Sequence, residues 1–479
     1  MKKKVFSAVR VGQQIVPLEV EISTTRAMLP RFTLLGLSGK QGEECKQRVL
    51  SALRQSGVLL PHTRLTVNLL PVDVPKSGTA HDLAIAIAIL QTYSFIPTTT
   101  CAAIGELGLD GEIRKPEGMY GFLGSFLDES HDIWIPPLEL PATLIDRFGS
   151  KLKPVSNLRE VIEISQNIRS TRILEPFTLS RPSQTEIFPT HYSQGLLRVL
   201  ELCLTGNHHT LLIGSPGLGK SHTKNLLEGL LPNLSLEQSW ARQQVLPAPT
   251  WCPQLDRVKA LDQATTVFQL LGNEKKSGAI FNLQYGVLFL DELPHFRKVL
   301  LQSLRRVLEK KATLTQPLSP LWWPHFVAVA TCNPCPCSYY GSKKCRCSEE
   351  QIKKYFQQIS GPLWDRFDVC WRVGTQDIKP MSLADWSEVQ TRIRHARHCQ
   401  EKRAQQTPGL PQFAGQYQWE HLHTCFADDS LFEAFFSNQG SWRKSIQQAR
   451  LACTLADLQQ EKVGHEHLEL ARFFQMELI

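Results

Sequence analysis

The chain has 479 residues, of which 42% are hydrophobic and 20% charged, which is typical of a soluble globular protein of two to four domains. No run of about 18 apolar residues occurs, so we expect no membrane span. Its thirteen cysteines are mostly scattered, and no apolar segment follows the basic start, so we expect a cytoplasmic protein without a signal peptide. The net charge of +8 is compatible with nucleic acid as a partner but does not establish one.

The first domain expected, residues 1–165, has the pattern of an α/β domain. Apolar residues that alternate with polar ones predict strands, and apolar residues at helical spacing predict helices, the first of which should stop at Gly57. Residues 166–190 are polar and include prolines, which predicts a linker. The elements expected in the first domain are strands over residues 16–22 and 64–70 and helices over residues 41–56 and 82–90.

The second domain expected, residues 191–375, contains a complete phosphate-binding loop between an apolar strand and a helix. The glycines of such a loop let backbone N–H groups turn toward phosphate, Lys220 can reach the β and γ oxygens, and Ser221 can ligate Mg²⁺. The pattern in this setting predicts that the chain binds ATP. The loop consists of Gly214, Ser215, Pro216, Gly217, Leu218, Gly219, Lys220 and Ser221.

A second motif lies about seventy residues further on, where the apolar strand 287–290 ends in two carboxylates. Asp291 would hold Mg²⁺, and Glu292 would polarise the water that attacks the γ-phosphate. The alternative is a buried strand that ends in a solvated acidic pair. Another apolar strand, 327–332, ends at Asn333, which is expected to orient the attacking water, although Asn-Pro alone predicts only a turn. These motifs predict ATP hydrolysis.

Two arginines are candidates for contacts with the γ-phosphate. Arg366 could act as a finger from a neighbouring subunit, or could belong to a local ion network with Asp365 and Asp368. Arg443 opens a helix in residues 376–479, a segment whose helical spacing predicts a small helical lid. It could report the state of the nucleotide, or be a surface arginine.

Four cysteines are packed into the loop 335–347 with the spacing C-x-C-x₇-C-x-C. Four thiolates at this spacing could hold a structural Zn²⁺ in tetrahedral geometry, but the same residues could be free thiols or form a disulfide loop. The aromatic and basic residues between the cysteine pairs could contact a nucleic-acid strand, or simply form a solvated turn. The residues are Cys335, Cys337, Cys345 and Cys347, with Tyr339, Tyr340, Lys343 and Lys344 between them.

Together these motifs resemble those of the magnesium-chelatase-like AAA+ ATPases, in particular the YifB/ComM group. The resemblance covers nearly the whole chain, and the string Asn-Pro-Cys-Pro-Cys is quite specific. It implies an α/β fold with an AAA+ P-loop core, a helical lid and a preceding α/β domain similar to the Lon protease domain. The matching segments are residues 67–71, 105–111, 214–221, 286–294, 333–337, 359–363, 365–368, 449–450 and 454–457.

The resemblance also implies a function. A member of this group would form a ring, expected to be a hexamer, that couples ATP hydrolysis to translocation along single-stranded or branched DNA. Such movement would serve branch migration during natural transformation and homologous recombination. The main alternative is a protein-remodelling motor of the chelatase type that binds no DNA, and a third is a Lon-like peptidase.

The first domain lacks the Ser–Lys pair of the proteases that it resembles. Alignment of residues 75–80 with the protease string places Ala80 where the nucleophile should stand, and the base position falls near Tyr120. We therefore expect a non-proteolytic scaffold.

The segments expected to face the substrate depart from the family pattern. Residues 245–251 replace an arginine-rich stretch, residues 272–278 are a reduced form of a glycine-rich loop, and Gln358 replaces an arginine. Lys275 and Lys276 keep positive charge for phosphates, unless this loop is simply solvated. ATP hydrolysis is therefore better supported by the sequence than DNA binding is.

Overall fold

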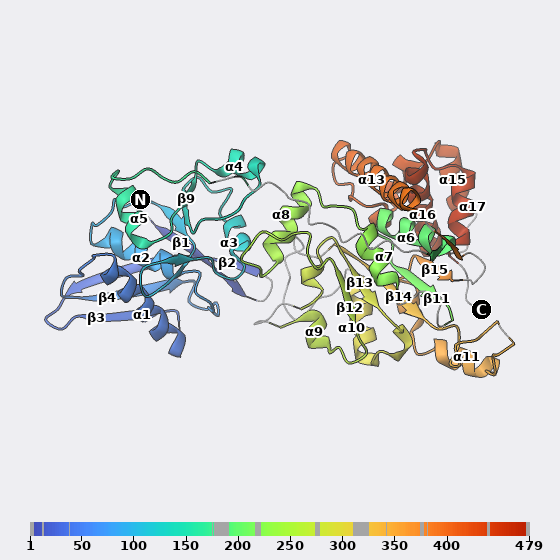
Figure 1. Ribbon diagram of the computed structural model, residues 1–479, viewed down its shortest axis with the longest axis horizontal. Helices are drawn as coiled ribbons and strands as arrows, with labels where there is room; N and C mark the ends of the chain where they lie inside the picture. Colours follow the sequence, from blue (N-terminus) through green and yellow to red (C-terminus); the bar gives the residue numbers. More distant parts are fainter. Residues whose placement is uncertain are drawn as a thin grey trace. The chain divides into compact units, whose positions relative to one another are not determined.

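The structure is a computed structural model of the chain (Figure 1). It describes residues 4–11, 14–37, 39–174, 176, 191–215, 222–273, 278–309, 325–341, 343–373, 378–380, 382–437 and 441–475. In this part of the chain, no helix is long and apolar enough to cross a membrane. Two compact units are present: unit 1 consists of Met1–Arg181, Ser235–Leu255 and Gly272–Ser277, and unit 2 consists of Pro182–Leu234, Asp256–Leu271 and Gly278–Ile479.

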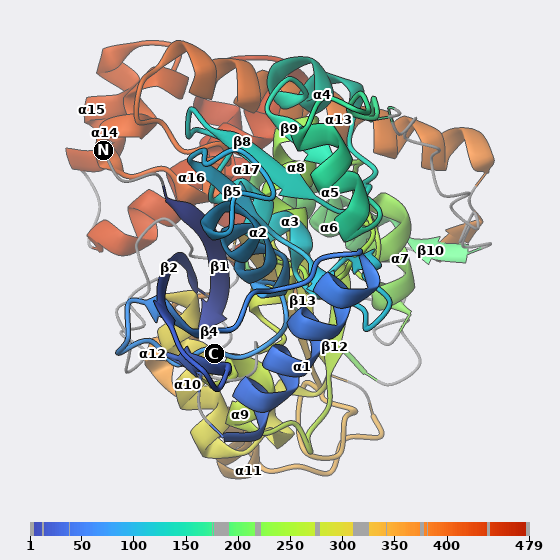
Figure 2. The ribbon, with the colours of Figure 1, turned by 90° about the vertical axis from the view of Figure 1, so that its left-hand side faces the viewer.

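Unit 1 contains a mixed seven-stranded sheet. Its strands are β1 (Val5–Val11), β2 (Gln14–Arg26), β3 (Arg31–Leu35), β4 (Thr63–Leu70), β5 (Cys101–Ala103), β8 (Asp132–Ile135) and β9 (Leu152–Pro154), with a separate pair, β6 (Glu106–Leu107) and β7 (Ile113–Arg114). Its helices are α1 (Gly39–Gln55), α2 (Asp82–Thr92), α3 (Met119–Gly124), α4 (Ala142–Phe148), α5 (Leu158–Ser165) and α8 (Leu236–Val245). The strand order is β3-β4-β2-β1-β5-β8-β9, and Figure 2 shows β1, β2 and β4 in blue.

The elements expected in the first domain are confirmed. The two predicted strands lie within β2 and β4, and the two predicted helices correspond to α1 and α2. Helix α2 is buried from Asp82 to Gln91, which explains why its sequence is apolar on every side. Gly57 has a φ of 84°, and this left-handed conformation after α1 is the one that glycine adopts most easily at a helix end.

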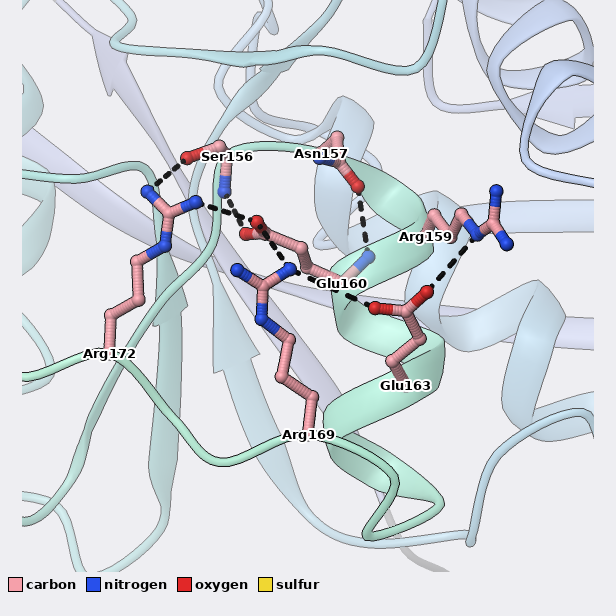
Figure 3. Close-up of polar contacts among 7 residues, drawn as sticks. All are labelled: Ser156, Asn157, Arg159, Glu160, Glu163, Arg169 and Arg172. Carbon is pink, nitrogen blue, oxygen red and sulfur yellow. Dashed lines mark hydrogen bonds and ion pairs between the residues drawn. The ribbon is translucent and has the colours of Figure 1, made fainter.

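Ion pairs hold the first residues of the predicted linker against α5 (Figure 3). The side chain of Glu160 is 4% exposed, and its Oε1 lies 3.0 Å from Nη1 of Arg169 and 2.9 Å from Nη2 of Arg172. Its Oε2 accepts a hydrogen bond of 2.8 Å from the backbone N–H of Ser156. The charge of this buried carboxylate is therefore neutralised, and the chain as far as Arg172 packs with unit 1.

Residues 235–255 pack in unit 1, although they lie between segments of unit 2 in the chain. The guanidinium of Arg10 donates to the backbone carbonyl of Gln244, with an Nη2–O distance of 3.2 Å. A Cβ atom on Gly121 would lie 2.4 Å from the same carbonyl oxygen, so the close approach of this segment to α3 requires glycine there. The sequence pattern does not predict this packing.

Unit 2 is built on a five-stranded parallel sheet with helices around it. The strands are β11 (Thr210–Ile213), β12 (Val258–Leu261), β13 (Gly286–Leu290), β14 (Phe326–Cys332) and β15 (Val369–Arg372), with a separate antiparallel pair, β10 (His191–Ser193) and β16 (Ile378–Pro380). The helices before β16 are α6 (Gln194–Gly206), α7 (Thr223–Leu230), α9 (Val267–Leu271), α10 (Lys298–Leu308), α11 (Glu349–Phe356) and α12 (Gly361–Trp364), with the 3₁₀ helices η1 (Phe281–Leu283) and η2 (Leu293–His295). The strand order is β12-β13-β14-β11-β15, and each neighbouring pair is parallel.

The residues after β16 form a group of helices, which Figure 1 shows in orange and red. They are α13 (Leu383–Gln406), α14 (Trp419–Leu422), α15 (Asp429–Ser437), α16 (Trp442–Gln459) and α17 (His465–Phe473), with the 3₁₀ helices η4 (Ala414–Gln416) and η5 (His423–Cys425). Their buried side chains share one hydrophobic core with α6 and with one face of the parallel sheet. The segment predicted as a helical lid is therefore helical, and it shares its hydrophobic core with the parallel sheet of unit 2.

Candidate active site

The carboxyl ends of three parallel strands bring Gly214, Asp291, Glu292 and Asn333 to one edge of the sheet of unit 2. Strand β14 lies between β11 and β13, with Cys332 opposite Ile213 and Ala330 opposite Leu290. The backbone N–H of Gly214 donates to the carbonyl oxygen of Cys332 over 3.1 Å. In open α/β sheets, ligands bind beyond the carboxyl ends of the strands, so this edge is the candidate active site.

The two carboxylates at the end of β13 are positioned by a threonine on the next strand. The buried hydroxyl of Thr331 donates to Oδ1 of Asp291 over 2.5 Å and accepts a 3.0 Å hydrogen bond from the backbone N–H of Glu292. Thr331 therefore fixes both the side chain of Asp291 and the backbone that carries Glu292. Thr331 was not among the predicted site residues, because threonine is common in strands and gives no separate signal.

Glu292 is held in a conformation that is uncommon for a residue other than glycine. Its φ and ψ are 56° and 55°, in the left-handed region, which costs on the order of 1–3 kcal/mol. Its Oε2 accepts a hydrogen bond of 3.0 Å from Nε2 of Gln263, which follows β12. The strained backbone turns the chain sharply at the end of β13, and Gln263 restrains the carboxylate that this turn presents. Gln263 was likewise not among the predicted site residues.

Of the predicted phosphate-binding loop, the structure describes Gly214, which is buried, and Ser215, which is half-buried. Pro216, Gly217, Leu218, Gly219, Lys220 and Ser221 lie outside the described residues, as do Lys275 and Lys276. Asn333 is half-buried and directly follows Cys332. Because β14 is the middle strand, Asn333 lies between the segment that follows β11 and the segment that follows β13.

Arg366 lies at the opposite edge of the same sheet. It precedes β15, where the backbone N–H of Asp368 donates to the carbonyl oxygen of His209 over 2.8 Å and Val369 pairs with Thr210, the first residue of β11. At about 3.3 Å per residue, the path from Thr210 to Gly214 is about 13 Å. A strand's length therefore separates Arg366 from Gly214, the first residue of the predicted phosphate-binding loop in its own subunit.

Arg366 and Arg443 line one cavity of about 400 Å³ between this edge of the sheet and α16. Arg366 forms an ion pair with Glu309, rather than with Asp365 or Asp368, among the contacts described for unit 2. Nη1 of Arg443 lies 3.5 Å from Oδ2 of Asp365, and both side chains are more than half exposed. The structure thus brings the two predicted arginines together, but away from Asp291 and Glu292.

The four cysteines of the loop 335–347 converge, with their sulfur atoms within 4.8 Å of one another. The Sγ of Cys337 lies 3.3 Å from that of Cys335 and 3.6 Å from that of Cys345. Zn–S bonds of about 2.3 Å in tetrahedral geometry place sulfur atoms about 3.8 Å apart, so the cluster fits zinc. Hydrogen bonds from the backbone of Arg346 and Tyr339 lower the pKa of the Cys337 thiol to about 6, whereas burial and hydrogen bonds to the other cysteines raise the pKa of Cys345 and Cys347.

The aromatic residues of this loop are partly exposed. Tyr339 and Tyr340 are each 43% exposed, and the guanidinium of Arg372 lies 5.4 Å from the centre of the Tyr340 ring. Lys343 and Lys344 follow in the same loop. The loop therefore presents two aromatic faces together with positive charge, which is the combination that single-stranded nucleic acid binds.

A second cluster with metal-ligating side chains lies in unit 1, where Cys45, His81 and Asp82 are buried together. Arg48 already pairs with the carboxylate of Asp82, at 2.7 Å from Nε to Oδ2 and 3.2 Å from Nη2 to Oδ1. Burial lowers the pKa of His81. The cluster is explained as a buried ion pair with neutral neighbours, because a cation there would face the charge of Arg48.

The predicted remnants of a protease centre also lie in unit 1. Ala80 is buried and has no nucleophile, and Tyr120 is buried with its hydroxyl donating to the carbonyl oxygen of Glu139 over 3.2 Å. Lys76 Nζ donates to the carbonyl oxygens of Pro71 and Val74, at 2.5 and 3.2 Å. These side chains have packing and hydrogen-bonding roles in unit 1, and the non-proteolytic scaffold stays a prediction.

The parallel order β12-β13-β14-β11-β15, with an acidic pair after β13 and a polar residue after the middle strand, defines an AAA+ P-loop fold. Residues 193–381 match the family described as "Magnesium chelatase, subunit ChlI", and residues 19–137 match "Subunit ChlI of Mg-chelatase". The chain belongs to the magnesium-chelatase-like AAA+ family, in its YifB/ComM group. The family implies ATP and Mg²⁺ as cofactors, and the carboxylate of Asp291 is a ligand of the kind that Mg²⁺ prefers.

Two relatives illustrate the extent of the similarity. The chain is 28% identical to the uncharacterized protein YifB of Escherichia coli, over 98% of this chain and 96% of that protein. It is 30% identical to the competence protein ComM of Haemophilus influenzae, over 76% of this chain and 75% of that protein. Both matches extend well beyond the phosphate-binding loop and its neighbouring strands.

Proposed function

We propose that this chain is a ring-forming ATPase, active as a hexamer in the cytoplasm, that hydrolyses ATP at the boundaries between its subunits. The observation that carries the proposal is the separation of the site residues onto two edges of one sheet. Asp291, Glu292 and Asn333 lie at one edge, and Arg366 and Arg443 line a cavity at the other. A ring that places the second edge of one subunit against the first edge of the next completes the site.

Within one subunit, Lys220 and the loop glycines would bind the phosphates, and Ser221 and Asp291 would hold Mg²⁺. Mg²⁺ would neutralise charge on the β- and γ-phosphates. Glu292, restrained by Gln263, accepts a proton from the attacking water, and Asn333 orients that water.

The neighbouring subunit would supply the remaining positive charge. Arg366 stabilises the negative charge that develops on the γ-phosphate, and Arg443 contacts the same phosphate and reports its presence. This arrangement makes turnover depend on ring assembly.

We further propose that turnover drives movement along single-stranded or branched DNA, as in branch migration during natural transformation and homologous recombination. Similarity to a protein named for competence supports this substrate. The exposed tyrosines and the lysines of the loop 335–347 offer a surface of suitable chemistry. A protein-remodelling motor is the alternative outcome of the test below.

The first experiment measures ATP turnover by the purified protein with and without single-stranded and forked DNA. Lys220→Ala serves as the blank, because it removes the phosphate-binding lysine. We expect DNA to stimulate turnover several-fold and the stimulation to disappear at high salt, because phosphate contacts release counterions. Robust turnover that ignores every DNA would contradict the DNA-motor proposal and favour protein remodelling.

We also propose that the loop 335–347 holds one structural Zn²⁺ through its four thiolates. Elemental analysis of the purified protein should give about one zinc per chain, as a four-thiolate site requires. Cys337→Ser should abolish it, whereas Cys399→Ser, which changes a partly buried thiol on α13, should leave the zinc content unchanged. Zinc-free protein with four titratable thiols in the loop would exclude the site.

A further inference from the structure

Glu309, at the end of α10, joins two arginines. Its Oε1 lies 2.8 Å from Nε of Arg305 and forms an ion pair with Nη2 of Arg366. The side chains of Glu309 and Arg366 are each 15% exposed, whereas that of Arg305 is 45% exposed. The hydrogen bonds from Arg305 and Arg366 lower the pKa of Glu309, so that its carboxyl is ionised at neutral pH.

The charges of this group leave Arg366 able to bind an anion. One carboxylate and two guanidiniums carry a net charge of +1. The positive charge of Arg305 therefore balances the negative charge of Glu309, and the positive charge of Arg366 remains. A guanidinium has five N–H donors, and Glu309 uses Nη2 of Arg366. The Nε of Arg366 is buried and has no hydrogen-bond partner among the described residues. The guanidinium is thus held through Nη2, with the donor at its buried Nε unused, in a residue that lines the cavity.

Glu309 is positioned by α10, which is also the helix that follows Glu292, the predicted general base. Helix α10 begins six residues after Glu292, and its eleven residues span about 17 Å. Its buried side chains pack with those of the parallel sheet in one hydrophobic core. Helix α10 therefore starts near the edge of the sheet that carries Glu292 and ends where Glu309 meets Arg366, at the edge that faces the neighbouring subunit in the proposed ring.

We propose that Glu309 is a positioning residue, which holds the guanidinium of Arg366 at the wall of the cavity in the orientation that serves the ATP of the neighbouring subunit. The inference rests on the proposed function, since it requires Arg366 to act in a neighbouring site. A long arginine side chain that is held in place loses less conformational freedom when the phosphate arrives. Glu309 acts through Arg366 and touches no reacting atom.

The test compares the kinetics of Glu309→Ala, Glu309→Gln and Arg366→Ala, alone and combined. Glu309→Ala should lower kcat by up to about 100-fold, because misplacing a catalytic group by about 1 Å costs that much. Glu309→Gln keeps an acceptor oxygen and should recover part of the loss. The double variant with Arg366→Ala should be no slower than Arg366→Ala alone. The matched control is Glu350→Gln, a 77% exposed partner of Lys354, which should leave kcat unchanged.

Mixed rings distinguish positioning from a fold defect. Subunits with Glu309→Ala keep an intact nucleotide site, and Lys220→Ala subunits keep an intact finger, so mixing them should restore turnover above that of either protein alone. The positioning role would be overturned if turnover did not return with Glu309→Ala subunits but did return with Arg366→Ala subunits in the same assay. Failure of Arg366→Ala itself would instead overturn the proposed intersubunit site. Measurements of nucleotide binding and thermal unfolding identify any variant that does not fold. If Glu309→Ala does not fold, the turnover of Glu309→Gln is compared with that of the unsubstituted protein instead.

Discussion

Glu292→Gln is expected to lower ATP turnover by about 10²–10⁴-fold, the usual contribution of a general base. The amide oxygen of glutamine can still accept the hydrogen bond that Gln263 donates to Glu292, so the local geometry should persist. Nucleotide binding should therefore be unchanged, because glutamine has nearly the shape of glutamate and lacks only the carboxylate that accepts the proton. The measurement is steady-state turnover together with equilibrium binding of ATP.

The control for this substitution is Glu350→Gln, which also replaces a glutamate with glutamine in unit 2, but at an exposed site on α11. It should retain normal turnover. If Glu292→Gln hydrolysed ATP at the normal rate, Glu292 could not be the general base, and the hydrogen bond with Gln263 would have only a structural meaning.

Arg366→Ala should reduce turnover by about 10³–10⁵-fold, the range known for arginine fingers, without weakening the binding of ATP. The substitution should be tolerated by the fold, because Glu309 keeps its partner Arg305. Arg394→Ala, which removes an arginine with exposed contacts on α13, is the control and should have little effect.

Mixing Arg366→Ala subunits with Lys220→Ala subunits tests where Arg366 acts. Each variant lacks one half of the site, and a mixed ring contains boundaries at which both halves are intact. We expect turnover to return in such mixtures and to peak at intermediate ratios. No recovery at any ratio would place Arg366 in its own subunit's site or give it a purely structural role.

The sequence predicts candidate site residues where chemistry restricts a position to a few residue types. A phosphate-binding loop needs glycines and a lysine at fixed spacing, and an apolar strand that ends in two carboxylates is unusual enough to identify Asp291 and Glu292. The four-cysteine cluster was also predicted, because its ligands lie close together in the chain. In each case the signal is local.

The parts that could not be predicted depend on contacts between distant segments. Thr331 and Gln263 meet the carboxylates only because β12, β13 and β14 are neighbours in the sheet. Glu309 meets Arg366 across 57 positions of the chain. Arg443 lies beside Arg366 in one cavity, and spacing along the chain could not show this. Threonine, glutamine and glutamate at such positions are too common to attract notice.

The packing of residues 235–255 in unit 1 bears on how this protein could be divided or recombined. In that segment Trp240 and Trp251 stack, with ring centroids 6.1 Å apart, and both pack against Tyr120 of α3. Because the chain crosses between the units on both sides of the segment, a cut in the polar stretch near residue 180 does not release an independent module. An ATPase trimmed at that point would expose two aromatic rings to water, and a first domain produced alone would lack part of its own core. The two units are therefore expected to be inherited, expressed and exchanged as one piece.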